Sequence, residues 1–227
     1  PLPPLGPRRF VPPAVAINEL PTIDFVMISH NHYDHLDLPT LRALARRNPQ
    51  THFLVPLGNA ALLQRHGIDN VRELDWGESV ELAGLTVHCL PAQHWSKRSL
   101  TDTNKALWSS WAVIGERRRF YHAGDTGYFP GFKQIAEYLG PFDLAAVPIG
   151  AYAPRQMMRA SHMNPEEAVS AALDLDAKTA VAMHFGTFDL SDEPLNQPPR
   201  RFKQAAAAQG LGEEQAWVLK IGETRSF

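Results

Sequence analysis

The sequence predicts one layered α/β domain. Short apolar runs of β-prone residues alternate with segments of helical periodicity, and no internal repeat or clear linker divides the chain. Several of the apolar runs are followed directly by histidine or aspartate. With 227 residues and 44% hydrophobic content, the chain is long enough to bury one substantial core.

Strands and helices alternate in the first half of the chain. Pro49 lies just beyond the first predicted helix, Asn59 is a good cap for the second, and Gly67 is typical of a helix end. Ala83 and Gly84 mark a turn. The predicted elements are a proline-rich extended arm over residues 1–22, a strand over 25–28, a helix over 38–47, a strand over 51–56, a helix over 59–67, and a two-stranded hairpin over 71–91.

The same alternation continues in the second half. Asn164 followed by Pro165 and two glutamates predicts a helix start, because it combines a cap, a proline at the first helical position and negative charge at the positive end of the helix dipole. The predicted elements are strands over 108–115 and 119–123, a helix over 131–138, a strand over 144–149, a helix from Asn164, a strand over 179–183, a helix over 200–209 and a strand over 216–221.

The densest chemical motif is Ser29-His30-Asn31-His32-Tyr33-Asp34-His35-Leu36-Asp37, which follows the first predicted strand. Three imidazoles and a carboxylate lie within six residues of this loop. Neutral imidazole and carboxylate are ligands that zinc and related divalent metals favour. A string of this kind arises by chance in roughly one chain per thousand of this composition, so a merely solvated polar loop is the weaker interpretation.

Three later strands also deliver a potential ligand to the loop at their carboxyl end, namely His94, Asp125 and His184. In a layered α/β domain such strand ends converge on one edge of the sheet, where ligand sites tend to lie. Seven donors suffice for two metals. We expect one ion to be held by His30, His32 and His94, the other by Asp34, His35 and His184, and both to be bridged by Asp125.

Composition excludes several classes of protein. The net charge of −2 gives no basic face of the kind that nucleic-acid binders carry. The single cysteine, Cys89, cannot form an internal disulfide and lies in an apolar run that predicts core packing. No apolar stretch reaches the length of a transmembrane helix, so we expect a cytoplasmic or peripheral membrane protein. The excess of arginine over lysine, with abundant alanine, is typical of a GC-rich bacterial source.

In combination, the motifs resemble the metallo-β-lactamase superfamily, and within it the branch of phospholipases D that hydrolyse N-acyl-phosphatidylethanolamine. The likeness extends from the arm to Arg225. The motifs that carry it are the loop at residues 29–37, Gln93-His94-Trp95 with Lys97-Arg98, Ala123-Gly124-Asp125-Thr126-Gly127-Tyr128, Pro148-Ile149-Gly150-Ala151-Tyr152, Asn164-Pro165-Glu166-Glu167-Ala168 and His184-Phe185-Gly186-Thr187-Phe188.

The resemblance implies a four-layer αβ/βα sandwich, with two β-sheets inside and helices outside. It implies two zinc ions held by the same seven ligands, with iron or manganese as alternatives. It also implies an amino-terminal region that contributes strands to the first sheet before the arm, so we expect residues 1–227 to form one domain of this fold without those strands. A homodimer remains open.

The implied reaction is cleavage of N-acyl-phosphatidylethanolamine-like lipids to N-acylethanolamine and phosphatidic acid, because two metals can ready a water for attack on a phosphodiester. Asp34 would orient that water. His162, in a loop before a helix, would contact the substrate phosphate or the leaving group. The remaining predicted substrate contacts are the cationic Lys97 and Arg98 and the aromatic Trp95 and Tyr152.

Two alternatives stay open. A related two-zinc hydrolase could act on a lactone or a cyclic phosphodiester, because a fold does not determine the bond that is cleaved. The chain could also be a non-catalytic module that binds lipid or metal. The complete set of ligands favours catalysis on a phospholipid or another small amphipathic substrate.

Overall fold

The computed structural model describes residues 6, 7 and 9–227. The described part of the arm is mostly exposed and contains a short 3-10 turn, η1 (Ile17–Glu19). Arg9 forms an isolated β-bridge with Phe188, and the backbone N–H of Phe10 donates to the carbonyl of Thr187 at 2.8 Å. The extended arm is therefore confirmed within the described residues, and residues 1–5 and 8 lie outside them.

The smaller sheet comes from the first third of the chain. In the described residues it contains three parallel strands in the order β1-β2-β3. Asp37 caps the helix that follows the His-rich loop, since its carboxylate accepts the backbone N–H of Thr40 at 3.0 Å. The elements are β1 (Phe25–Met27), α1 (Leu38–Arg47), β2 (His52–Pro56), α2 (Ala60–Gln64) and β3 (Val71–Leu74).

The larger sheet has seven strands in the described residues, in the order β10-β9-β8-β7-β6-β5-β4. Strands β7 to β10 pair in parallel, whereas β4 to β7 pair antiparallel. Its elements are β4 (Ser79–Leu82), β5 (Leu85–Leu90), β6 (Ser110–Ile114), β7 (Arg119–His122), α3 (Gly131–Leu139), β8 (Phe142–Pro148), α4 (Arg155–Met158), α5 (Pro165–Asp174), β9 (Ala177–Met183), α6 (Gln197–Ala208) and β10 (Ala216–Trp217).

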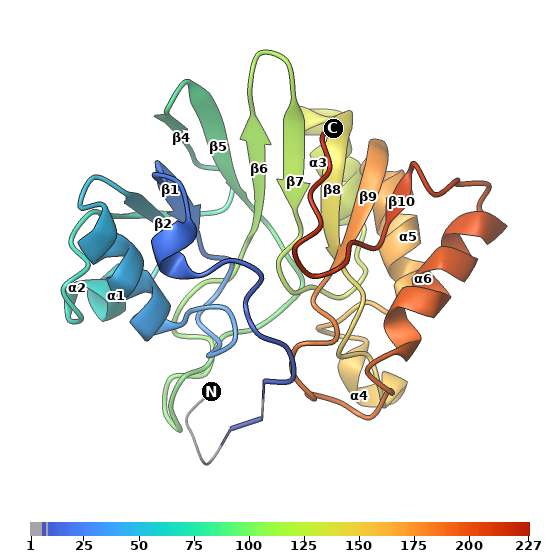
Figure 1. Ribbon diagram of the computed structural model, residues 1–227, viewed down its shortest axis with the longest axis horizontal. Coiled ribbons are helices and arrows are strands. Elements are labelled where there is room, and N and C mark those ends of the chain that lie inside the picture. Colours follow the sequence, from blue (N-terminus) through green and yellow to red (C-terminus); the bar gives the residue numbers. More distant parts are fainter. Residues whose placement is uncertain (1–5, 8) are drawn as a thin grey trace.

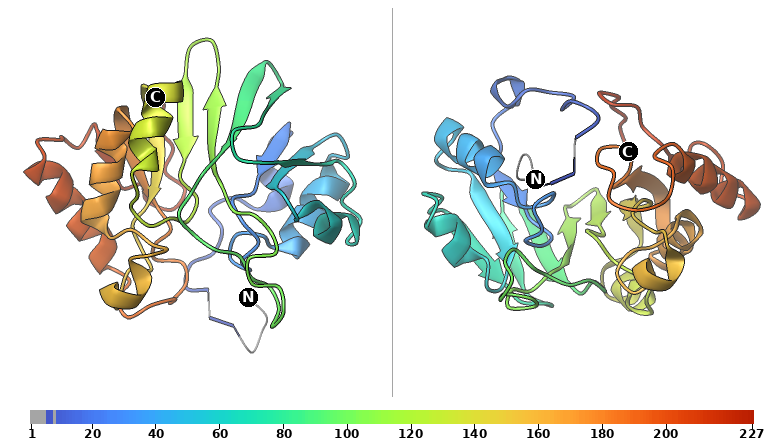
Figure 2. Two further views of the ribbon diagram at one scale, coloured as in Figure 1. Left: turned by 180° about the vertical axis from the view of Figure 1, so that it is seen from behind. Right: turned by 90° about the horizontal axis from the view of Figure 1, so that it is seen from below.

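The two sheets face each other, and helices cover their outer sides (Figures 1 and 2). One apolar cluster packs the smaller sheet against α1 and α2, and another packs the larger sheet against α3, α5 and α6. A third cluster lies between the sheets and includes Leu54, Cys89 and the fully buried Trp111. This arrangement confirms the four-layer sandwich and the predicted core position of Cys89. In the described part of the chain, no helix combines the length and the apolar character of a membrane span.

Three predicted elements were wrong in detail. Residues 71–74 do not belong to the hairpin but join β2 as the parallel strand β3; the hairpin is β4-β5, with Ala83 in the left-handed region at its turn. The last strand ends at Trp217 rather than at residue 221. The helix predicted over 200–209 begins earlier, at Gln197, because prolines are tolerated in the first turn of a helix.

Candidate metal centre

Strand ends bring the predicted ligands to one place. The loop at residues 29–37 follows β1, His94 follows β5, Asp125 follows β7 and His184 follows β9. The structure gathers all seven predicted donors there, in one group of His30, His32 and His94 and a second of Asp34, His35, Asp125 and His184, with ligand atoms within 4.8 Å of one another in each group.

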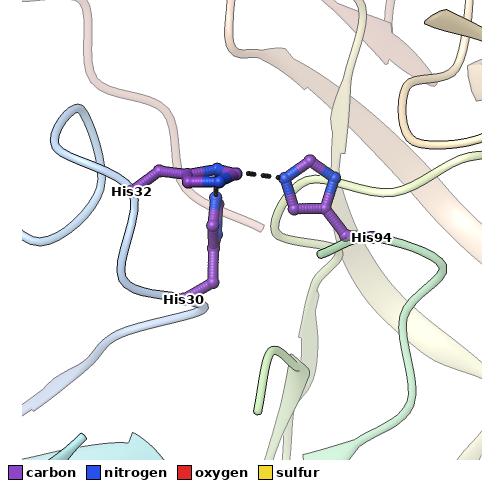
Figure 3. Close-up of side chains that lie close together, drawn as sticks. All are labelled: His30, His32 and His94. Carbon is purple, nitrogen blue, oxygen red and sulfur yellow. Dashed lines mark hydrogen bonds between the residues drawn. The ribbon is translucent and has the colours of Figure 1, made fainter. Parts of the chain in front are cut away.

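The first group consists of three imidazoles whose nitrogens face one another (Figure 3). His30 Nε2 lies 2.8 Å from His32 Nδ1, and His94 Nε2 lies 3.3 Å from the same atom. His30 and His94 are buried, whereas His32 is half-buried. Three nitrogen donors therefore converge on one small volume.

The second group combines two carboxylates with two imidazoles. Asp125 Oδ2 lies 3.1 Å from His35 Nε2 and 3.2 Å from His184 Nε2. Asp34 Oδ2 lies 3.5 Å and 3.6 Å from the same two nitrogens. The four side chains thus surround a second small volume.

Asp125 connects the two groups. Its Oδ2 atom also lies 3.9 Å from His30 Nε2 and 3.9 Å from His94 Nε2. Asp125 is buried, and its other carboxylate oxygen has no hydrogen-bond partner among the described residues. One carboxylate therefore stands between both sets of nitrogens, which is the position that a bridging ligand needs.

Neighbouring groups orient the rings. His94 Nδ1 lies 2.9 Å from the carbonyl oxygen of Ser161, so this nitrogen carries the proton and Nε2 keeps its lone pair. Ser29 Oγ lies 3.0 Å from His30 Nδ1 and 3.3 Å from His35 Nδ1. Such contacts leave the opposite ring nitrogens free to face the centre.

The pKa values of the histidines are lowered in the first group and raised in the second. Burial lowers the pKa of His94 to about 3 and holds the pKa of His30 well below its ordinary value, so both imidazoles are neutral. Burial alone would also lower the pKa of His35 and His184, but the charge of Asp125 and the hydrogen bonds to Asp125 and Asp34 together outweigh it and raise the pKa to about 9 and about 10. Once His35 and His184 have lost their protons, five imidazoles and two carboxylates form a donor set that fits divalent cations.

A close approach between the backbone at Gly150 and the backbone at His184 holds His184 in place. His184 has φ of 57°, a left-handed conformation that few residues other than glycine adopt. Gly150, at the end of β8, packs directly beneath it, and a Cβ atom there would overlap the carbonyl oxygen of His184. Only a residue without a side chain fits this close approach between the ends of β8 and β9.

Two cavities open beside the donors. An apolar cavity of about 400 Å³ reaches Asp34, Asp125 and His184, and the other, of about 270 Å³, reaches Asp34, His35 and His184. Phe188 and Leu190 line both cavities. The apolar cavity is further lined by Tyr33, Trp95, Met158 and His162.

The predicted substrate contacts fall into two sets. Trp95 and His162 line the apolar cavity, and the rings of His162 and His94 lie 5.0 Å apart. Tyr152 instead lies in a separate cavity, where its hydroxyl donates to Gln197. Lys97 and Arg98 line neither cavity beside the donors. Instead, the backbone N–H of Lys97 and the side chain of Arg98 donate hydrogen bonds to Asn31 in the His-rich loop.

Sequence reasoning missed Arg9. Among the described residues it is the one arginine or lysine that lines either of the two cavities, and it belongs to the smaller one. Its Nε donates to the carbonyl of Val11 at 2.7 Å. The proline-rich arm contains no periodic signal that would have placed this side chain near the donors; only its positive charge could have drawn attention.

Fold and site together define a domain of the metallohydrolase type: two facing sheets between helices, with clustered histidines and aspartates at the strand ends. Residues 2–185 match the family model described as the beta-lactamase superfamily domain. The chain belongs to this family.

Relatives refine the relationship. The chain is 46% identical over 205 residues to N-acyl-phosphatidylethanolamine-hydrolyzing phospholipase D 1 of Caenorhabditis elegans, covering 86% of this chain and 58% of that protein. It is 35% identical to the mitochondrial enzyme of that name in Saccharomyces cerevisiae, covering 98% of this chain and 49% of that protein. A metal-dependent hydrolase of Methanopyrus kandleri is 32% identical and is covered to 81%. The chain thus spans about half the length of the first two relatives.

Among solved structures, a metallo hydrolase of Ignicoccus hospitalis is 26% identical, with a TM-score of 0.70 over 91% of this chain and 80% of that one. This likeness confirms the predicted fold class. Relatives of similar identity occur in a nematode and in Mycobacterium tuberculosis, so they do not support a bacterial source in particular.

Proposed function

We propose that this domain is a metal-dependent hydrolase that cleaves an N-acyl-phosphatidylethanolamine-like phosphodiester, releasing an N-acylethanolamine and phosphatidic acid. One observation carries the proposal: seven His and Asp donors are gathered at one place, and four of them, His32, Asp34, Asp125 and His184, line an apolar cavity of about 400 Å³. The names of the nematode and yeast relatives support the choice of lipid.

In this proposal two zinc ions, or iron or manganese in their place, occupy the two donor groups. His30, His32 and His94 would hold one ion, Asp34, His35 and His184 would hold the other, and Asp125 would contribute to both. When bound, such ions lower the pKa of a water molecule toward neutrality and neutralise charge on phosphate oxygens.

Asp34 and His162 complete the chemistry. Burial alone would raise the pKa of Asp34, but its contacts with His184 and His35 hold it below its usual range, so the carboxylate is ionised and can accept a hydrogen bond from the attacking water. Burial lowers the pKa of His162 to about 4, so its imidazole is neutral. Its Nδ1 has no partner among the described residues and is available to the phosphate or the leaving group.

The cavity walls fit a lipid. Aromatic and aliphatic side chains line the larger cavity and provide an apolar surface for an acyl chain. Two strongly exposed apolar side chains lie close in sequence to residues of the centre: Leu100, which is 94% exposed, and Met157, which is 76% exposed and precedes the cavity residue Met158. We therefore include peripheral contact with a membrane surface in the proposal. A homodimer stays a prediction.

The test combines metal analysis with turnover of three substrates: N-acyl-phosphatidylethanolamine, a simple phosphodiester and a lactone. We expect about two metal ions per chain and preferred cleavage of the lipid diester. Full metal content with cleavage of the lactone alone would refute the phosphodiesterase and favour the alternative hydrolase. Metal binding without any turnover would favour the non-catalytic module. The Asp34→Asn variant should lose most of the rate, and an undiminished rate would contradict the role given to Asp34.

A further inference from the structure

We infer that Arg98 is a positioning residue. It fixes the spacing between the two halves of the His-rich loop, residues 29–37, and so determines the affinity of the centre for metal. The inference rests on the proposed metal binding, but not on the identity of the substrate. It begins from two hydrogen bonds: Arg98 Nη1 donates to the carbonyl of Asn31 at 2.7 Å and to the carbonyl of Leu36 at 2.9 Å.

The two carbonyls lie at opposite ends of the ligand-bearing segment. Asn31 stands between His30 and His32, which belong to the first donor group, and Leu36 follows His35, which belongs to the second. One guanidinium nitrogen therefore ties together the backbone that carries both groups. A change in its position would alter the spacing between the groups and not merely the orientation of one ligand.

The aromatic residue of the loop adds a second attachment. The Arg98 guanidinium lies over the Tyr33 ring at 4.0 Å, and the Tyr33 hydroxyl donates back to the carbonyl of Arg98 at 3.0 Å. The neighbouring backbone N–H of Lys97 donates to the Asn31 side chain at 3.1 Å. The two loops thus hold each other through side chains and backbone in both directions.

The segment that presents Arg98 is itself anchored. Asp102 Oδ1 accepts the backbone N–H of Arg98 at 3.0 Å and that of Ser99 at 2.8 Å. Arg98 is half-buried, so its contacts are partly shielded from water. These contacts also explain why Arg98 is absent from both cavities: its guanidinium is engaged with the loop rather than directed to a substrate phosphate.

Arginine suits this task and lysine does not. An ammonium group could also donate to two carbonyls, but it has no planar face, whereas the guanidinium of Arg98 donates to both carbonyls and stacks on the Tyr33 ring at the same time. Arg98→Lys keeps the charge but should loosen the loop. Removing a group that orients metal ligands typically weakens metal binding by roughly 10–100-fold, and we expect a loss in this range.

The matched control is Arg119→Lys. Arg119 is also half-buried, and its Nη1 also donates to two backbone carbonyls, those of Leu139 at 2.6 Å and Gly140 at 3.1 Å. It stands at the start of β7, whereas Asp125 follows the end of that strand. A general loss of stability would affect both variants alike, but a positioning role predicts a loss of metal affinity in Arg98→Lys only.

The experiment measures zinc affinity by competition with a chromogenic chelator, together with the rise in Tm on adding zinc to chelator-treated protein. Arg98→Lys should bind zinc about tenfold or more weakly and show a smaller rise in Tm, because ligand stabilisation follows affinity. Arg119→Lys should keep the wild-type affinity. Wild-type affinity in Arg98→Lys, or an equal loss in both variants, would overturn the inference.

A second variant covers the case in which Arg98→Lys does not fold. Asp102→Ala removes the acceptor that anchors the Arg98 segment without touching the His-rich loop, and it should weaken zinc binding in the same direction. Unchanged affinity there would count as refutation. Failure of the proposed function is distinguishable, since a wild-type protein that binds zinc but cleaves no phosphodiester leaves this inference standing. A wild-type protein that binds no metal overturns both.

Discussion

His94 donates a hydrogen bond from Nδ1 to the carbonyl oxygen of Ser161 at 2.9 Å, and the residue after that carbonyl is His162. The segment between α4 and α5 is thereby attached to a ring of the first donor group. One attachment fixes the tautomer of His94 and brings a second histidine to the cavity wall.

Asp125→Asn should reduce the metal content most. The substitution keeps the shape of the side chain but removes the charge that stands between both groups of nitrogens. We expect the content after dialysis to fall from about two ions per chain to about one or fewer, measured by elemental analysis. Asp143→Asn is the control, since Asp143 pairs with Lys178 outside the centre; full retention in Asp125→Asn would refute the bridging role.

Metal uptake should release protons. With metal removed by a chelator, the pKa values of about 9 for His35 and about 10 for His184 lie above neutrality, so both rings carry a proton at pH 7. A ligand imidazole must be neutral, so binding at pH 7 releases up to about two protons, and affinity falls as the pH falls. Calorimetry in two buffers of different ionisation enthalpy measures this release; identical heats would contradict it.

His162→Ala should separate catalysis from metal binding. A positioned acid or base contributes roughly 10²-fold or more to the rate, so kcat should fall by that factor. Metal content should stay unchanged if His162 acts on the substrate. Because its ligand atom lies within 4.8 Å of those of His94 and Asp125, a joint loss of metal and rate would instead assign His162 as a ligand.

Arg9→Gln should affect anionic substrates selectively. The side chain lines the cavity that reaches His35 and His184, where a phosphate monoanion would meet its charge. We expect KM for a phosphodiester to rise about tenfold, with no change for a neutral lactone if one is cleaved. Arg65→Gln on the surface near α2 serves as the control. An equal rise for both substrates would indicate a distorted cavity mouth rather than charge recognition.

Leu100→Glu combined with Met157→Glu should weaken binding to lipid vesicles. Both side chains are strongly exposed, and acidic replacements there would oppose contact with an anionic bilayer. Co-sedimentation with vesicles should fall, while hydrolysis of a short-chain monodisperse substrate stays the same. Tyr138→Glu, at an exposed position on α3, is the control and should sediment like the wild type.

The donors were predictable because each stands just beyond a short apolar run. A strand can be recognised locally from its run of apolar residues, and the strand that precedes each of His94, Asp125 and His184 determines where that residue lies. The choice of strand partner leaves no such signal. Residues 71–74 join β2 although the helix α2 lies between them in the chain, and only the packing of the smaller sheet selects that partner.

The directions in which side chains point were the other feature that could not be predicted from the sequence. Arg98 and Lys97 follow His94 closely, so their charges suggested a phosphate site, but the direction of their loop depends on carbonyls of residues 31 and 36. Tyr152 was misplaced for a related reason, since the backbone at Ala151 takes a left-handed turn with φ of 61° just before it. Neither feature follows from periodicity or composition.

The crossing of Gly150 beneath His184 constrains how this domain can be redesigned. If position 150 were randomised in a mutagenesis library aimed at new substrates, most variants would have a distorted metal centre, because every replacement would displace the strand end that carries His184. Phe188 and Leu190 are better starting points: they line both cavities, lie a few residues downstream, and are absent from the two groups of donors. Selectivity can therefore be varied while the donors remain untouched.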